Sequence, residues 1–150
     1  MKLLIAVTAV TFAASLLGAV LADAFLVARV PILGDFASLQ YSHNAGVAFG
    51  MKLPGGVQEV AILIALIVVV IVAVREARRL PASRFPLTAF GLILGGGIAN
   101  VVDRVRDGYV TDFFQVGTFP IFNIADSCIT IGVIILLLEA VIQRKRDSKV

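Results

Sequence analysis

The sequence has very few of the residues that bind metals or form disulfides. Its 150 residues include one cysteine, Cys128, one histidine, His43, and no tryptophan. A single cysteine excludes an internal disulfide. Zinc usually needs three or four His, Cys or carboxylate ligands, and the sequence contains no such cluster. We therefore expect no metal site and no cofactor.

Charged residues are also scarce, at 15% of the chain, whereas apolar residues make up 59%. An average soluble domain is roughly 45–50% apolar, and the mean hydropathy here is +1.01. A water-soluble fold of this length could not bury so much apolar surface. The solvent of this protein is therefore, at least in part, lipid.

Four apolar stretches predict membrane-spanning helices. A span needs roughly 20 residues, and lipid favours helices because every backbone amide must find an internal partner. The fold class expected is an all-α membrane protein. Residues 1–150 are expected to form a single domain. Its predicted spans are at about 3–22, 57–74, 85–102 and 123–142, and its predicted outer loops are at about 23–56 and 103–122.

The first stretch has an alternative interpretation as a cleaved signal peptide. Lys2 provides a basic start, and Val20-Leu-Ala22 resembles a cleavage site. The apolar run is longer than the roughly 7–15 residues that are normal for a signal peptide. A retained helix is therefore the favoured interpretation.

The distribution of basic residues predicts the orientation. Nine of the thirteen Lys and Arg residues are Lys2 or lie in the segment 75–84 or the tail after Gln143. An even number of spans places these three regions on one side, which the positive-inside rule makes cytoplasmic. Both outer loops then face the other side. Because the basic residues flank apolar spans without interleaved aromatics, nucleic acid is not an expected partner.

The first outer loop is broken up by Gly, Pro and Asn, with short β-type runs such as Phe36–Tyr41 between them. This pattern predicts a small irregular or stranded layer on the membrane surface.

Two acids lie where an apolar chain accommodates charge least easily. Asp112 lies in Gly108-Tyr-Val-Thr-Asp-Phe-Phe114, and Asp126 lies at the start of the last apolar run. Paired carboxylates tend to share one proton, which suits the hydrolysis of a peptide bond without a metal. The alternatives are that Asp126 is a first-turn carboxylate capped by Asn123 and that Asp112 is an ordinary loop residue.

Three further motifs have both a structural and a functional interpretation. Asp103 and Arg104 could anchor the loop as an ion pair, or Arg104 could bind a substrate carbonyl or a lipid headgroup. Gly95-Gly-Gly97 could let helices approach closely or leave room for an extended peptide. Asn44 could hydrogen-bond a substrate backbone or simply form a turn.

Taken together, the motifs resemble the type II (lipoprotein) signal peptidases of bacteria. The resemblance covers nearly the whole chain and rests on four stretches: Asn44-Ala-Gly-Val-Ala-Phe49, Gly95-Gly-Gly-Ile-Ala-Asn100, Asp103-Arg-Val-Arg-Asp-Gly-Tyr-Val-Thr-Asp-Phe113 and Phe122-Asn-Ile-Ala-Asp126. It departs from the family pattern at Val27, where a lysine is usual, and at Ala99, where a glycine is usual.

The resemblance implies a membrane aspartic endopeptidase with Asp112 and Asp126 as its catalytic dyad. The other matched positions are the expected orienting and substrate-binding residues: Asn44, Gly95, Asn100, Asp103, Arg104, Asn123 and Ala125. It also implies a β-cradle and a short amphipathic helix over the outer face, in a bacterial inner membrane with both termini cytoplasmic. The substrate would be a diacylglyceryl-modified prolipoprotein, met in membrane lipid and without an obligate protein partner.

Two rival functions remain open from the residues alone. In a small transporter or proton-coupled subunit, Asp126 and Glu139 would lie along a transmembrane path, with only Ser127 and Thr130 as polar groups nearby. In a structural adaptor, both aspartates would tolerate alanine and only the packing glycines would matter.

Overall fold

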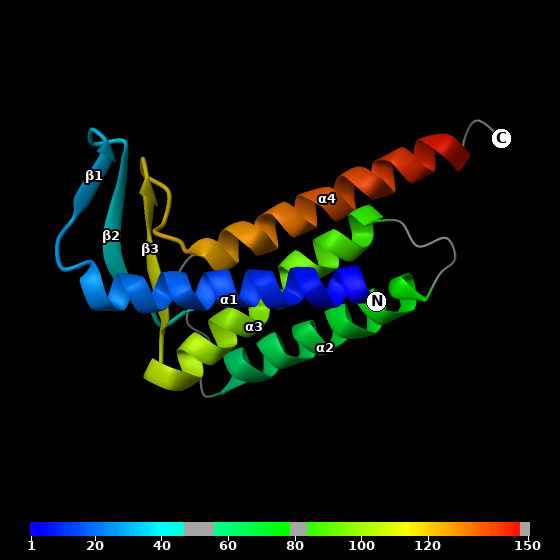
Figure 1. The fold of residues 1–150 in the computed structure, drawn as a ribbon, viewed down its shortest axis with the longest axis horizontal. Coiled ribbons are helices and arrows are strands. Elements are labelled where there is room, and N and C mark those ends of the chain that lie inside the picture. Colours follow the sequence, from blue (N-terminus) through cyan, green and yellow to red (C-terminus); the bar gives the residue numbers. More distant parts are fainter. Residues whose placement is uncertain (47–55, 79–83, 148–150) are drawn as a thin grey trace.

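The computed structural model describes residues 1–46, 56–78 and 84–147 (Figure 1). Within these ranges, four long helices and three short strands follow one another along the chain: α1 (Lys2–Phe25), β1 (Val30–Leu33), β2 (Ala37–Asn44), α2 (Val57–Ala77), α3 (Arg84–Asp107), β3 (Val110–Val116) and α4 (Ile124–Asp147). The helices form a bundle with the sheet at one end, and both termini lie toward the other end (Figure 1).

All four helices are long and apolar enough to cross a membrane. Many of their large apolar side chains face outward, as Val68 on α2 and Leu138 on α4 illustrate, with 52% and 58% of their surfaces exposed. An exposed apolar exterior of this extent is stable only against lipid. The prediction of a four-span membrane protein is therefore confirmed.

The helices pack through glycines that bring their backbones together. A Cβ atom at Gly95 of α3 would lie 2.6 Å from the Thr8 carbonyl oxygen of α1, and one at Gly96 would lie 2.6 Å from the Ala125 carbonyl oxygen of α4. Small residues permit such close approach in membrane bundles. Helix α3 is therefore the central element, with α1 on one side and α4 on another.

The three strands form one antiparallel sheet in the order β1-β2-β3. Strand β2 extends the predicted Phe36–Tyr41 run to Asn44, and a register shift between Leu39 and Ser42 interrupts its pairing with β3. After the shift, Ser42 pairs with Asp112. The strand therefore carries Asp112 beside the end of β2, where Asn44 lies.

Helix α3 continues further than its apolar pattern predicted. Asp103 and Arg104, expected in an outer loop, lie in its last turns, and the helix ends at Asp107. Gly108 then adopts a positive φ of 83° and donates its N–H to the Arg104 carbonyl at 2.8 Å. A left-handed glycine is a common helix terminator, so the C-terminus is set by Gly108 rather than by the loss of hydropathy.

The short amphipathic helix implied by the family resemblance does not occur within residues 1–46, 56–78 and 84–147. The second half of the Asn44–Phe49 motif lies outside the described residues.

Candidate functional site at the sheet end of the bundle

Asp112 is buried between the sheet and the helix ends, with only 2% of its surface exposed. Its two carboxylate oxygens accept hydrogen bonds from different asparagines. Asn44 Nδ2 donates to Oδ2 at 2.9 Å, and Asn123 Nδ2 donates to Oδ1 at 2.8 Å. Asp112 is therefore not an ordinary loop residue, because a buried carboxylate with two amide donors requires a prepared site.

Asp126 lies in the first turn of α4, where Asn123 precedes the helix. Asn123 Oδ1 accepts the Asp126 backbone N–H at 2.9 Å, and Asp126 Oδ2 accepts the Asn123 N–H at a longer 3.4 Å. This is the reciprocal arrangement of a capping box, with aspartate in the usual place of glutamate. The helix-cap interpretation of Asp126 is thus confirmed, but it describes only one of its two oxygens.

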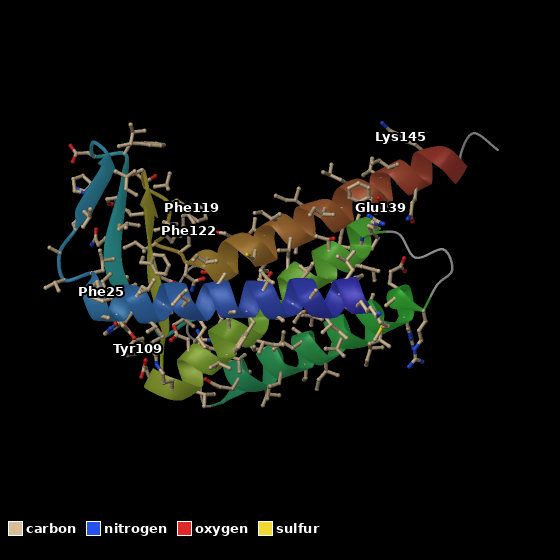
Figure 2. The ribbon with its side chains drawn as sticks, viewed as in Figure 1. Phe25, Tyr109, Phe119, Phe122, Glu139 and Lys145 are labelled. Carbon is tan, nitrogen blue, oxygen red and sulfur yellow. The ribbon has the colours of Figure 1, made fainter. Side chains whose placement is uncertain are left out.

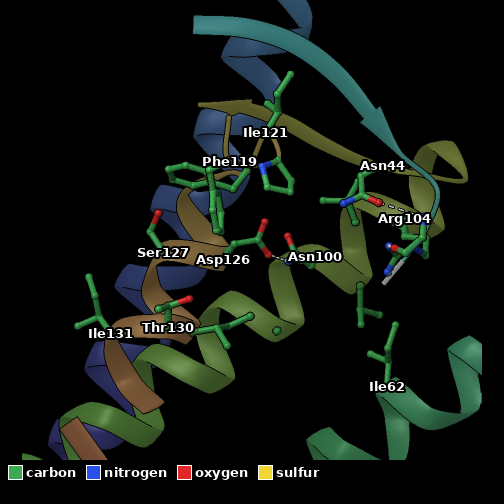
Figure 3. A pocket seen from close by; sticks show the side chains of 17 residues that line it. Asn44, Ile62, Asn100, Arg104, Phe119, Ile121, Asp126, Ser127, Thr130 and Ile131 are labelled. Atoms are coloured by element: carbon green, nitrogen blue, oxygen red, sulfur yellow. Dashed lines mark hydrogen bonds between the residues drawn. The ribbon is translucent and has the colours of Figure 1, made fainter. Parts of the chain in front are cut away.

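The other oxygen of Asp126 belongs to a side-chain network that reaches Asp112. Asn100 Nδ2 donates to Asp126 Oδ1 at 2.8 Å (Figure 3), and Asn100 Oδ1 accepts from Asn123 Nδ2 at 3.1 Å. Asn123 therefore contacts both acids and the asparagine between them. Three elements, β3, α3 and α4, meet through this one residue.

Burial raises the pKa of the Asp112 carboxyl to about 6. Desolvation is the main cause, and the negative charge of Asp126 adds to it, whereas the amides of Asn44 and Asn123 act in the opposite direction. A carboxyl with a pKa close to neutral can exchange its proton during a reaction at physiological pH.

The raised pKa predicts that the Asp112→Asn change has a pH-dependent effect on stability. Asp112 binds its proton more tightly in the folded state. Its stabilising contribution is therefore complete below pH 3.8, the ordinary pKa, and is lost as the pH rises through about 6. A raised pKa of this size corresponds to roughly 3 kcal/mol. The melting temperature of Asp112→Asn minus that of wild type should therefore be larger at pH 8 than at pH 4.

Thermal unfolding of both proteins in detergent measures this difference. Asp35→Asn, which removes an exposed carboxylate, controls for the general loss of one charge. A melting difference between Asp112→Asn and wild type that stays constant from pH 4 to pH 8 would contradict the effect.

A cavity of about 630 Å³ lies beside Asp126, whose side chain points into it in Figure 3. Its walls come from the end of β2, from α2, α3 and α4, and from residues 119–122. Asp126, Asn100, Asn44 and Arg104 are the polar groups at its acidic end, and most of the remaining lining is apolar. Asp112 lies behind Asn44 and Asn123 rather than in the cavity wall. A bound molecule would therefore meet Asp126 first.

Two other predicted residues hold the surroundings of the site. Asp103, only 3% exposed, accepts the Thr111 backbone N–H at 2.6 Å and so ties the end of α3 to the start of β3, next to Asp112. Arg104 donates from a terminal guanidinium nitrogen to the Gly46 carbonyl at 2.6 Å. Asp103 and Arg104 do not form the ion pair that the loop-anchor hypothesis proposed. Asp103 Oδ1 instead lies 3.3 Å from Arg106 Nη2.

The structure does not bring Gly95 to the site. Its missing side chain accommodates Thr8 and Thr11 of α1, whereas Gly97, two residues later, lines the cavity. Successive helix positions are rotated by about 100°, which separates the two. Ala125 is 1% exposed, and its carbonyl oxygen lies against Gly96. It therefore packs α4 onto α3.

The cavity wall also contains four residues that were not predicted to belong to the site: Phe119, Pro120, Ile121 and Thr130. Thr130 could have been found, because it lies four residues after Asp126 and therefore on the same helix face. No comparable signal marks residues 119–121, whose position depends on how the chain crosses from β3 to α4.

The two functions of Asn123 can be separated by substitution. Asn123→Ser keeps an oxygen that can cap α4 but loses the Nδ2 that contacts Asp112 and Asn100, whereas Asn123→Ala loses both. We expect Asn123→Ala to lose about 1 kcal/mol of stability and Asn123→Ser to stay near wild type, while both lose most activity. Thermal unfolding and an activity assay measure the two effects. Full activity of the serine variant would contradict the assignment.

Four apolar helices, with a buried acid at one end joined by asparagines to a second acid that lines an apolar cavity, define a multi-pass membrane protein with a carboxylate site. Residues 4–142 match the family model described as signal peptidase (SPase) II. The chain therefore belongs to the signal peptidase II family.

Individual relatives agree with the family match. The chain is 37% identical over 126 residues to a lipoprotein signal peptidase of Symbiobacterium thermophilum, which covers 80% of each protein. It is 40% identical over 132 residues to that of Chlorobaculum tepidum, covering 77% of this chain and 79% of the relative.

A solved structure has a similar fold over almost the whole chain. It is a bacterial membrane enzyme structure, determined by the in meso method at 2.3 Å resolution. The TM-score is 0.82 at 25% identity, and the alignment covers 97% of this chain and 92% of the other.

Proposed function

We propose that this protein is an aspartic endopeptidase that uses Asp112 and Asp126 to remove the signal peptide from prolipoproteins. Family membership supports a protease, and the names of the relatives supply the substrate class. The observation that carries the proposal is the network in which Asn123 contacts both acids, so that Asp112 of β3 is joined to Asp126 of α4, which lines the cavity.

The proposed reaction needs one proton shared by the two acids. The ionised member takes a proton from a water molecule, which attacks the scissile carbonyl, while the protonated member donates to the carbonyl oxygen. When the tetrahedral intermediate breaks down, a carboxyl returns a proton to the leaving amine. Because the two acids titrate as a pair, the roles are assigned to the pair. The asparagines keep both acids oriented during these transfers.

The cavity also supports a substrate that carries lipid. Its lining is largely apolar, and it is formed in part by Ile129 and Ile131 of α4, of which Ile131 is 51% exposed on the outside of the bundle. A diacylglyceryl group could therefore stay in lipid while the peptide bond reaches Asp126. With the charge distribution, this supports a site near the outer leaflet of a bacterial inner membrane, with both termini cytoplasmic.

A cleavage assay with paired substrates tests this function. Purified protein in micelles should release the signal peptide from a diacylglyceryl precursor, cutting just before the modified cysteine. It should cleave the same precursor without lipid at least about tenfold more slowly, because each buried methylene contributes about 0.8 kcal/mol. Mass spectrometry identifies the bond. Equal rates would refute the lipid preference, and no cleavage of either substrate would refute the peptidase.

The transporter hypothesis is not supported by the position of Glu139. Figure 2 shows Glu139 far along α4 from the sheet end. It accepts a hydrogen bond from Gln143 one turn further on, and it does not line the cavity that contains Asp126.

A further inference from the structure

A compact apolar surface lies at the ends of the strands, at the edge of the site. We call it the tip surface and define it by four residues of the β1–β2 hairpin and the end of β3. Their exposed fractions are 65% for Leu33, 60% for Phe36, 36% for Val116 and 55% for Phe119. Exposed apolar surface of this kind usually marks a place where another apolar phase or partner is met.

The four residues are held together by the backbone. Leu33 pairs with Ala37, which pairs with Val116 on the next strand. Gly117, with a positive φ of 53°, donates to the Phe36 carbonyl at 2.7 Å, and Phe119 donates to the Val116 carbonyl at 3.0 Å. The tip surface is therefore a fixed part of the fold and not a set of independent side chains.

The tip surface lies next to the lipid-facing side of α4. In Figure 1 the strand ends project past the first turns of α4, and Figure 2 shows Phe119 and Phe122 beside that helix start. Phe119 and Ile131 line the same cavity, and Ile131 and Ile134 are 51% and 49% exposed on α4. The apolar exterior of the membrane span thus continues onto the tip surface without a charged residue in positions 113–125.

The backbone limits how deeply this surface can enter a bilayer. Among the described residues, strand β1 is an edge strand that pairs only with β2, so the N–H and C=O groups of its other edge need water or headgroups. Hydrocarbon offers no partner for them. Figure 1 shows β1 as the strand farthest from α4. The strand edge therefore belongs among headgroups, and only the side chains of the tip surface reach the acyl chains.

We propose that the tip surface is an interfacial anchor that inserts Leu33, Phe36 and Phe119 between phospholipids of the leaflet surrounding the sheet end of the bundle. The anchor fixes the depth of the sheet in the headgroup layer beside α4. Phe119 contacts both the lipid and the rim of the cavity. The anchoring depends on the fold and the apolar surface, and it stands whether or not the two aspartates are catalytic.

The absence of tryptophan from the chain allows a direct test with single-tryptophan variants. Phe36→Trp, Phe119→Trp and Leu33→Trp each place one probe on the tip surface, and each is reconstituted into phosphatidylcholine vesicles. Val27→Trp is the control. Val27 is also apolar and is 95% exposed, but it lies in the α1–β1 connection, at the opposite end of β1 from the tip surface (Figure 1).

Brominated phosphatidylcholine should quench the tip probes at least about threefold more strongly than the control, with shallow bromines more effective than deep ones. Equal quenching at Val27 and the tip would overturn the proposal, as would tip probes that are unquenched and emit as in water. Tip probes that are blue-shifted but unquenched would show a protein partner or second copy in place of lipid, which also overturns it. Three tip positions keep the test valid if one variant misfolds.

Discussion

Asp112→Asn and Asp126→Asn are each expected to abolish cleavage of a lipidated precursor while leaving the protein folded. General acid–base catalysis by one group contributes about 10²–10⁴-fold. Here Asp126 also affects the charge of Asp112, because burial and, to a lesser degree, the negative charge of Asp126 raise the pKa of Asp112. Losing either carboxyl removes the shared proton, so the loss should reach the upper part of that range. Initial rates with purified protein measure it.

Asparagine is a stringent test of the carboxylate at these positions because it keeps the shape of aspartate. An amide still offers one oxygen to Asn44 or Asn123 at position 112, and to Asn100 at position 126. The melting temperature and circular dichroism spectrum should therefore show an intact helical bundle. Asp35→Asn, at an exposed turn residue, should cleave at the wild-type rate. Substantial cleavage by either dyad variant would refute the mechanism.

Gly96→Ala should destabilise the protein and reduce its activity together. The added Cβ would lie 2.6 Å from the Ala125 carbonyl oxygen and 3.0 Å from Ile129. A backbone oxygen cannot rotate away, so α4 must move as a whole. Overpacking of this kind costs about 1–3 kcal/mol. Because Asp126 follows Ala125 directly, the same movement should lengthen its hydrogen bond to Asn100 and slow cleavage.

The neighbouring glycine offers a matched control for stability. A Cβ at Gly97 would meet Leu66 Cδ2 at 2.6 Å, which is the far end of a flexible side chain that can adopt another rotamer. The free energy of unfolding of Gly97→Ala should therefore lie within about 0.5 kcal/mol of the wild-type value. Equal melting temperatures for the two alanine variants would show that the close approach of α3 and α4 is not what Gly96 provides.

Much of the fold was predictable because, in a bilayer, the positions of the helices depend mainly on one property of the sequence, its hydropathy. All four apolar stretches became helices, but each helix is longer than its stretch. Polar residues at a membrane boundary remain good helix formers, so hydropathy does not mark where a helix ends. The end of α3 depended instead on the conformation of Gly108.

The two acids could be predicted from the sequence, but the way they are joined could not. Asp112 and Asp126 stood out because charge is rare in this chain, and the family resemblance named the asparagines around them. That Asn123 contacts both acids while also capping α4 depends on the angle at which β3 approaches the helix. Likewise, only the rotation of α3 decides that Gly97 and not Gly95 faces the cavity.

The order in which the network residues occur along the chain has a consequence for biosynthesis. Of the five side chains in the network, Asn44 comes early, and the other four fall between positions 100 and 126. Asp126 takes its position only when the final span begins. A nascent chain that has inserted three spans thus holds one acid without its counterpart, so the proposed mechanism predicts no activity before the start of α4 has been made.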